Sequence, residues 1–285
     1  MKKEIEIKCP AKINLTLDVI NRRTDGYHNL SMIMQEINLF DILKITVELD
    51  TSESIIRFET ESEKIPADEN NLVTKAAKLF FEKTNIATSA RIHLEKNIPV
   101  GAGLGGGSSD AAGTLVGLNT LFDNPMSFDD MAALAKYLGA DVPFFLYGGC
   151  MLAEGIGEKL TPLPKLKDAF IVLAKPKVTV STAHVYKSLV LDDKVQHPDT
   201  NAVIDALYSQ DIDALAKAAG NVLETVTAKE YPEIEHYKSI MLKNGASYSL
   251  MSGSGSSVFG VFKDKSLADN ALKEFLSLTK DAFLL

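Results

Sequence analysis

Cysteine, long apolar runs and excess positive charge are scarce or absent in this sequence. Its two cysteines, Cys9 and Cys150, lack the spacing of a metal site and are expected to be small buried residues in a reducing compartment. There is no run of about 18 apolar residues and no apolar region near the charged N-terminus, so neither a membrane span nor an export signal is predicted. The net charge of −8 argues against nucleic acid or an anionic membrane as the main partner. We therefore expect a cytoplasmic protein.

Hydrophobic residues make up 46% of the 285 residues, which is enough to form the core of one large domain or of two modest ones. Alternating apolar residues predict strands in the first half, which short connections place in a largely antiparallel sheet. These strands cover residues 4–8, 11–20, 31–39, 42–49, 55–59 and 148–157. Apolar residues at helical spacing predict helices over residues 71–83, 109–121 and 128–138. The segment 158–167 contains Pro162 and Pro164 and is predicted to be a connection.

The second half repeats this alternation of strands and helices. It is predicted to hold strands at 169–174, 247–251, 257–262 and near Ala282, and helices at 182–189, 201–207, 212–222, 231–244 and 267–278. Sheet and helices in each half predict an α+β protein with two lobes. The boundary is placed near residue 160, which divides residues 1–160 from residues 161–285.

The segment Pro99–Asp110 is rich in glycine and comes directly before a predicted helix. A backbone with so few side chains is able to turn its N–H groups toward an anion, and a helix N-terminus adds free amides and the positive end of the dipole. A flexible linker is the alternative, but the flanking strand and helix patterns disfavour it. We predict a phosphate-binding loop, with Asp110 as an acidic residue that stabilises the first helical turn.

The residues around these glycines distinguish between three well-known phosphate-binding loops. A P-loop is excluded because no lysine follows the glycines. A dinucleotide-binding fingerprint is matched by Gly101, Gly103 and Gly106, but the acidic residue near the required distance, Asp123, lies in a predicted turn. A protein-kinase loop is disfavoured because no His-Arg-Asp or Asp-Phe-Gly segment follows.

Five motifs in order along nearly the whole chain resemble the GHMP small-molecule kinases, the superfamily of galactokinase, homoserine kinase and mevalonate kinase. They begin at Pro10 (PAKINLTL), Arg23 (RTDGYHNL), Pro99 (PVGAGLGGGSSDAA), Gly139 (GADVPFF) and Met251 (MSGSG). The resemblance implies a two-lobed fold, with an N-terminal lobe like domain 2 of ribosomal protein S5 and a ferredoxin-like C-terminal lobe. It also implies ATP as cosubstrate, accompanied by Mg²⁺, and a small-molecule substrate that carries a cytidine diphosphate group.

The resemblance assigns the ATP loop to consecutive residues. These are Pro99, Val100, Gly101, Ala102, Gly103, Leu104, Gly105, Gly106, Gly107, Ser108 and Ser109. No motif identifies a protein ligand for a metal, and no sequence feature establishes the oligomeric state. A second glycine turn, residues 252–257, is interpreted either as a hairpin turn or as a loop close to the phosphates.

Lys12 and Asp141 are the catalytic residues that the resemblance implies. Asp141 lies in an apolar run, where a buried carboxylate needs a donor or a cation, and the resemblance makes it the base. Lys12 shares one face of a predicted strand with Asn14 and Thr16 and is the partner implied for Asp141. The alternatives are a solvated lysine on an exposed strand face and a turn or helix-cap carboxylate near Gly139.

Substrate binding is expected to involve Asn14 and an aromatic slot for cytosine. An Asp-Gly turn would present Tyr27 for stacking and His28 for hydrogen bonding, and the resemblance makes Tyr186 the second wall. The alternatives are a Tyr27 packed on the sheet, a solvated His28 and a Tyr186 in the core. Other functions considered are a GHMP kinase for a different alcohol, a nucleotide-binding regulator without catalysis and an NAD-binding protein.

Overall fold

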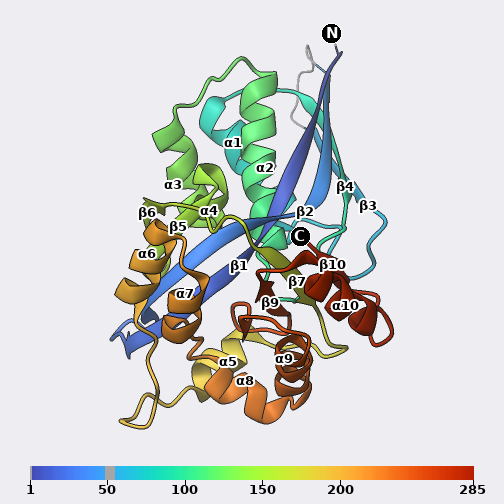
Figure 1. Cartoon of the computed structure of the whole chain (residues 1–285). Helices are drawn as coiled ribbons and strands as arrows, with labels where there is room; N and C mark the ends of the chain where they lie inside the picture. The colour runs from blue at the N-terminus through green and yellow to red at the C-terminus, as the bar shows by residue number, and fades with distance from the viewer. Residues whose placement is uncertain (1, 49–54) are drawn as a thin grey trace. The chain divides into compact units, whose positions relative to one another are not determined.

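A computed structural model describes residues 2–48 and 55–285 of the chain. The chain divides into two compact units, each assembled from separate segments (Figure 1). Unit 1 comprises Met1–Ala11, Asn38–Val100 and Gly105–Gly148, and unit 2 comprises Lys12–Ile37, Gly101–Leu104 and Gly149–Leu285.

Two long strands, β1 (Lys2–Arg22) and β2 (His28–Glu48), contribute residues to both units. The sequence predicts two strands in place of each, whereas the structure forms one. Pro10 fits within β1 because its fixed φ is compatible with extended backbone, and Asp41 continues β2 as a fully buried residue. Leu49, the predicted end of a strand, lies outside the described residues.

In unit 1, strands form a sheet that is covered by helices. β4 (Ser89–Glu95) pairs antiparallel with the end of β2, and β3 (Ile55–Thr60) pairs parallel with β4. The helices are α1 (Leu72–Thr84), α2 (Gly106–Leu121), α3 (Phe128–Leu138) and α4 (Val142–Tyr147). Fully buried side chains of α1, α2, β2 and β4 form one apolar cluster, including Phe80, Leu115, Leu43 and Ile92. This core fixes the position of the N-terminus of α2.

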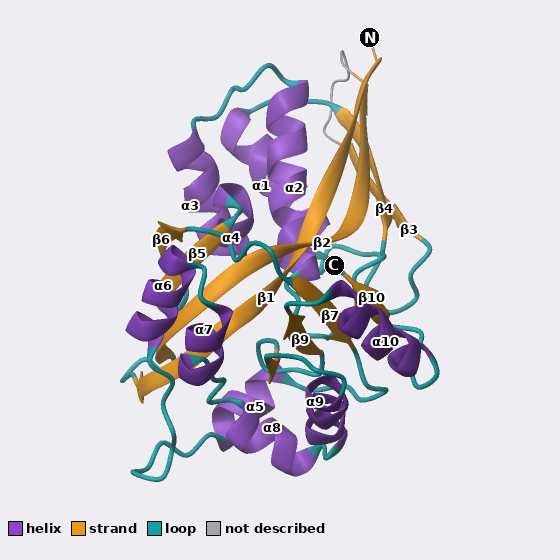
Figure 2. Ribbon diagram, viewed as in Figure 1, coloured by secondary structure: helices purple, strands orange, loops and turns teal. Residues whose placement is uncertain are grey.

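Unit 2 contains a separate four-stranded antiparallel sheet. Its order is β10 (Ala282–Leu284), β7 (Phe170–Ala174), β9 (Val258–Phe262) and β8 (Tyr248–Met251). The helices of this unit are α5 (Thr182–Ser188), α6 (Thr200–Ser209), α7 (Ile212–Ala218), α8 (Glu224–Glu230), α9 (Glu233–Lys243) and α10 (Lys265–Leu276). Contacts join α9 to β8 and β9, and α10 to β7 and β10 (Figure 2).

Unit 2 also holds strands β5 (Cys150–Gly155) and β6 (Lys159–Leu163). A strand was predicted where β5 lies, whereas β6 forms within the segment 158–167 that was predicted to be a connection. β5 pairs antiparallel with the start of β2 and with β6. The prediction of a connection was wrong for residues 159–163, which form β6. Pro162 is tolerated there because β6 is the edge strand of its sheet, and one side of an edge strand has no neighbouring strand that needs an N–H donor. Helix α8 was also missed. The domain boundary near residue 160 stays a prediction.

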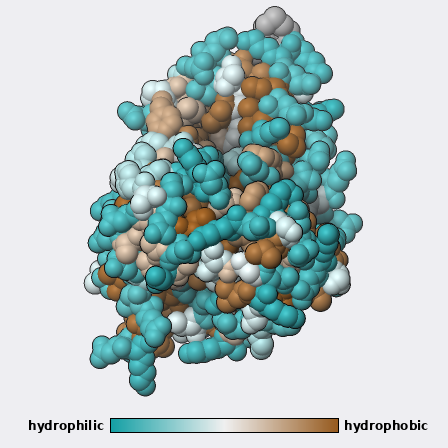
Figure 3. All heavy atoms as spheres, in the orientation of Figure 1, coloured by the Kyte–Doolittle hydropathy of each residue, from teal (hydrophilic) through white to brown (hydrophobic). Residues whose placement is uncertain are grey.

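Hydrophilic residues cover much of the face shown in Figure 3, interspersed with hydrophobic ones. Across residues 2–48 and 55–285, no helix is both long and apolar enough to cross a membrane.

Candidate active site

The predicted phosphate loop leads directly into α2, as expected. Three glycines in this segment have positive φ: Gly101 (63°), Gly103 (74°) and Gly105 (71°), a conformation that side chains oppose. The helix begins at Gly106, earlier than the predicted Ser109, because Gly105 is its N-cap and the Ser109 N–H bonds to the Gly105 carbonyl at 2.9 Å. No side chain caps this end of the helix. Its first amides therefore have the geometry suited to an anion.

Residues 101–104 of this loop bind the second glycine loop, residues 252–257, within unit 2. The Ser252 hydroxyl donates to the Gly103 carbonyl at 3.0 Å, and the Ser257 N–H donates to the Ala102 carbonyl at 3.2 Å. A Cβ built on Gly103 would lie 2.0 Å from the Ser252 carbonyl oxygen. The turn between β8 and β9 is thus more than a hairpin connection, since it supports the first loop by direct contact.

Asn221 also holds the second glycine loop through hydrogen bonds. Its side-chain amide donates to the carbonyls of Met251 (2.7 Å) and Gly253 (2.8 Å), and its oxygen accepts from the Leu223 N–H at 3.0 Å. Sequence reasoning missed Asn221, because it lies outside the five motifs and its partners Met251 and Gly253 are about 30 residues away along the chain.

Lys12 is a buried lysine bound to the first glycine loop. Only 4% of it is exposed, and its ammonium donates to the Asn14 side-chain oxygen at 2.6 Å and to the Gly103 carbonyl at 3.0 Å. Its backbone N–H also donates to the Leu104 carbonyl at 3.0 Å. A solvated lysine on an exposed strand is therefore excluded. The face shared by Lys12, Asn14 and Thr16 is buried, as is the apolar face of the same strand.

Asp141 lies at the N-cap position of α4 in unit 1. Its φ and ψ are −85° and −12°, and its side chain makes no capping hydrogen bond. The alternative that the Asp141 carboxylate caps a helix is therefore not supported. Because Asp141 belongs to unit 1 and Lys12 to unit 2, their pairing stays a prediction.

Two of the three predicted aromatic residues meet in unit 2. The rings of His28 and Tyr186 are 5.3 Å apart between centroids and inclined at 34°, where β2 begins and α5 passes. Burial, followed by the positive charge of Arg22, lowers the pKa of His28, which favours the neutral ring as a hydrogen-bonding group. Tyr27 is 61% exposed, so it is not packed on the sheet. His28 is partly buried rather than solvated.

The interpretation of Asp110 was wrong. Asp110 is 2% exposed and follows the first turn of α2, where its Oδ2 accepts from the Lys96 ammonium at 2.8 Å. Lys96 also donates to the buried carboxylate of Asp41. Burial, and then the charge of Asp41, outweigh Lys96 and raise the pKa of Asp110 to about 7. The error arose because the helix begins earlier than predicted and the partners are distant in sequence.

The residues described do not supply a cluster of protein ligands for a metal. Over the parts of the chain that the structure describes, no three His, Cys, Asp or Glu side chains are grouped to hold an ion. A Mg²⁺ ion that arrives with ATP needs few protein ligands, because phosphate oxygens and water fill most of its coordination shell.

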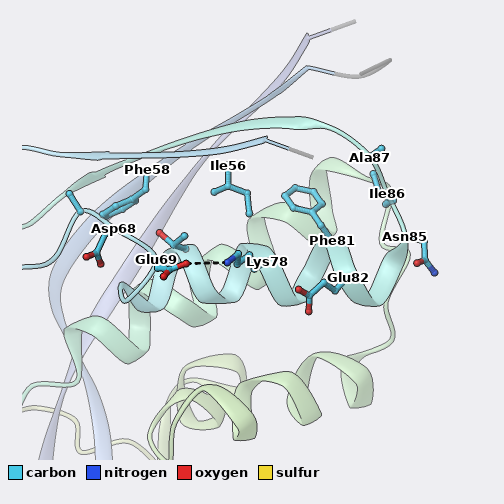
Figure 4. Close-up of a pocket in the computed structure, with 12 residues that line it drawn as sticks. Ile56, Phe58, Asp68, Glu69, Lys78, Phe81, Glu82, Asn85, Ile86 and Ala87 are labelled. Atoms are coloured by element: carbon cyan, nitrogen blue, oxygen red, sulfur yellow. Dashed lines mark ion pairs between the residues drawn. The ribbon is translucent and has the colours of Figure 1, made fainter. Parts of the chain in front are cut away.

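A separate pocket of about 630 Å³ lies in unit 1 between β3 and α1 (Figure 4). Ile56, Phe58 and Phe81 line it, and the Glu69–Lys78 ion pair, 3.5 Å, lies along the helix. The predicted site residues are not among those that line this pocket.

Two family descriptions match the sequence. The GHMP kinases N terminal domain matches residues 71–149, and the GHMP kinases C terminal domain matches residues 203–279. The chain belongs to the GHMP kinase family. The α+β class and the fold expected from the resemblance are confirmed, and ATP is the cosubstrate of this kinase.

Several relatives share one name. The chain is 46% identical to "4-diphosphocytidyl-2-C-methyl-D-erythritol kinase" of Lachnoclostridium phytofermentans over 271 residues, 95% of this chain and 92% of the relative. It is also 46% identical to the protein of that name from Clostridioides difficile, over 98% of this chain and 94% of the relative. The relatives of this name thus match this chain over nearly its whole length and over nearly their own.

Solved structures give the same result for the fold. A crystal structure of 4-(cytidine 5'-diphospho)-2C-methyl-D-erythritol kinase is 36% identical, with a TM-score of 0.83 and 98% of both chains covered. A homoserine kinase from Cytophaga hutchinsonii has a TM-score of 0.79 at 21% identity, covering 100% of this chain and 95% of the other. The second likeness concerns the fold alone.

Proposed function

We propose that this kinase transfers the γ-phosphoryl group of ATP to the 2-hydroxyl of 4-diphosphocytidyl-2-C-methyl-D-erythritol, giving ADP and the 2-phosphate in non-mevalonate isoprenoid precursor synthesis. The observation that carries this proposal is 46% identity, over 95% of the chain, to a protein named for that substrate. Kinases for other alcohols in the family share the fold at far lower identity.

In the proposed reaction, the hydroxyl oxygen attacks the γ-phosphorus and the bond from that phosphorus to the bridging oxygen breaks, so that ADP leaves. Asp141 accepts the hydroxyl proton. The loop amides of residues 99–109 hold the phosphates, and Lys12, already bound to the Gly103 carbonyl, stabilises the negative charge that spreads over the transferred group. Mg²⁺ brought in with ATP would supply further positive charge at the phosphates.

The aromatic pair of unit 2 provides the proposed cytosine site. His28 and Tyr186 are in ring contact, and Tyr27, next to His28 in the sequence, is exposed, so we assign the stacking and hydrogen-bonding roles toward cytosine to these three side chains. Asn14 is assigned to the polyol end because it is bonded to Lys12. The reducing cytoplasm is the proposed location, which suits two buried free thiols.

The test is a product analysis with a panel of acceptors. Purified protein, ATP and Mg²⁺ are incubated with 4-diphosphocytidyl-2-C-methyl-D-erythritol, homoserine or mevalonate, and ADP and the phosphorus NMR spectrum of the product are measured. We expect turnover with the first acceptor and a new phosphomonoester signal. Turnover with homoserine or mevalonate alone would assign a different GHMP kinase, and no turnover with any acceptor would reject the proposal.

A further inference from the structure

A buried cluster of three charged groups lies under the first turn of α2. Lys96 follows β4, Asp41 lies in β2 and Asp110 lies in α2, and the lysine donates to both carboxylates. The side chains of Lys96, Asp41 and Asp110 are 7%, 0% and 3% exposed. Asp41 also accepts from the Asn97 and Ile98 N–H groups, at 2.6 and 2.8 Å. The cluster therefore joins β2 and the end of β4 to the helix that follows the ATP loop.

The cluster is adjacent to the beginning of the helix. A Cβ on Gly106, the first residue of α2, would lie 3.1 Å from the Lys96 ammonium and 3.4 Å from Asp41 Oδ2. The amides of this turn are those assigned to the phosphates. Any net charge on the cluster consequently acts on bound ATP from within the protein, where screening by solvent is weak.

The charges in the cluster do not balance when all three groups are ionised. Two carboxylates face one ammonium, and the Cys9 thiol of β1 is a further titratable group beside them, whose pKa is raised first by burial and then by Asp110 and Asp41. Asp110 Oδ1 is buried and makes no hydrogen bond. An ionised oxygen without a partner is costly in such a place, so a proton on Asp110 removes both the excess negative charge and that cost.

We propose that Asp110 is a positioning residue for ATP that takes up a proton as the phosphates bind, so that the cluster beneath the loop becomes neutral when the loop is occupied. This inference rests on the proposed phosphate role of the loop. The bond from Lys96 to Asp110 holds the helical turn in place, and the proton removes the charge that would repel the phosphates. The raised pKa of Asp110, about 7, supports this role because the proton is then exchangeable near neutral pH.

The first experiment compares the KM for ATP of the full-length wild type, Asp110→Asn and Asp123→Asn between pH 6.5 and 8.5. Asp123, just beyond the other end of α2 and exposed, is the matched control for loss of one negative charge. We expect the KM of the wild type and of Asp123→Asn to rise several-fold above pH 7, with a limit of about tenfold per pH unit for one linked proton. The Asn variant is neutral at every pH, so its KM should stay within about twofold, with the acceptor KM unchanged.

The second experiment counts protons directly. Calorimetric titration with a non-hydrolysable ATP analogue and Mg²⁺ at pH 8, in two buffers of different ionisation enthalpy, gives the protons taken up on binding. We expect the wild type to take up more than Asp110→Asn by as much as one proton. Equal proton counts, parallel KM profiles, or an Asn variant weakened by the same factor at every pH would overturn the inference, the last because it indicates a purely structural residue.

If Asp110→Asn does not fold, Asp41→Asn serves instead. That change leaves one carboxylate for Lys96, and its amide oxygen is still able to accept from the Asn97 and Ile98 N–H groups. The rise of KM above pH 7 should then disappear, and its persistence would overturn the inference. A wild type that binds no nucleotide at all would instead reject the proposed function, and this inference with it.

Discussion

Gly103→Ala is the change that most sharply tests the contact between the two glycine loops. The new Cβ would lie 2.0 Å from the Ser252 carbonyl oxygen, 2.9 Å from its carbon and 3.2 Å from the Gly255 carbonyl oxygen. All three are backbone atoms, so no side-chain rotation relieves the clash. The φ of 74° adds a separate penalty for any residue with a Cβ.

The magnitude follows from these two effects. The left-handed conformation costs about 1–2 kcal/mol, and forcing an extra methyl group into a packed site costs about 1–3 kcal/mol. We therefore expect Gly103→Ala to lower the free energy of unfolding by about 2–5 kcal/mol. Movement of the Gly103 carbonyl also disturbs its hydrogen bonds from Lys12 and Ser252, so we expect a raised KM for ATP and a lower kcat.

Gly101→Ala is the matched control in the same loop. Its φ is 63°, but the nearest atom to a new Cβ is the Thr179 methyl carbon at 3.9 Å, an ordinary contact. It carries the conformational penalty without the clash. Urea unfolding of both variants should therefore differ by about 1–3 kcal/mol, with Gly103→Ala the less stable. Equal losses in the two variants would refute the close approach of the loops.

Three further predictions concern unit 1 and the thiols. Gly113→Ala places a Cβ 2.4 Å from the Cys9 sulfur, so it should lower the free energy of unfolding in urea by about 1–3 kcal/mol. Adding Cys9→Ala to this variant should recover part of the loss, and no recovery would contradict this packing. Because burial raises the pKa of Cys150 to about 12 and that of Cys9 further, neither thiol should react with a disulfide reagent at pH 8 until urea unfolds the protein, and rapid native labelling would contradict their burial. Burial raises the pKa of Asp110 from its ordinary value of 3.8 to about 7, so the folded chain keeps a proton that the unfolded chain releases. Between about pH 4 and pH 7 the wild type should therefore lose unfolding free energy relative to Asp110→Asn, by at most about 1.4 kcal/mol per pH unit. Parallel urea midpoints of the two proteins across this range would contradict the raised pKa.

Local patterns predicted most of the elements. Helix α3 has the predicted bounds, because Ser127 caps its N-terminus and an apolar stripe continues to Leu138. The strands of the second lobe and the turn at 252–257 were also predicted within a residue or two. Such features depend on neighbours along the chain, and the sequence contains all of the information they need.

Features that depend on distant partners were not predicted. Asp110 was placed in the first helical turn, because nothing near it in sequence reveals Asp41. Lys12 was found through its motif, yet its burial depends on Gly103 and Asn14, and Asn221 was missed altogether. The two proline residues near β6 gave a misleading signal, since an edge strand tolerates what a central strand does not.

The most direct test of the account is a crystal structure of the protein with both a non-hydrolysable ATP analogue and the cytidine substrate. The account predicts the triphosphate against the backbone amides of residues 99–109, cytosine at the His28–Tyr186 pair, and the 2-hydroxyl between the terminal phosphate and the Asp141 carboxylate. An empty glycine loop, or a terminal phosphate remote from Asp141, would contradict it.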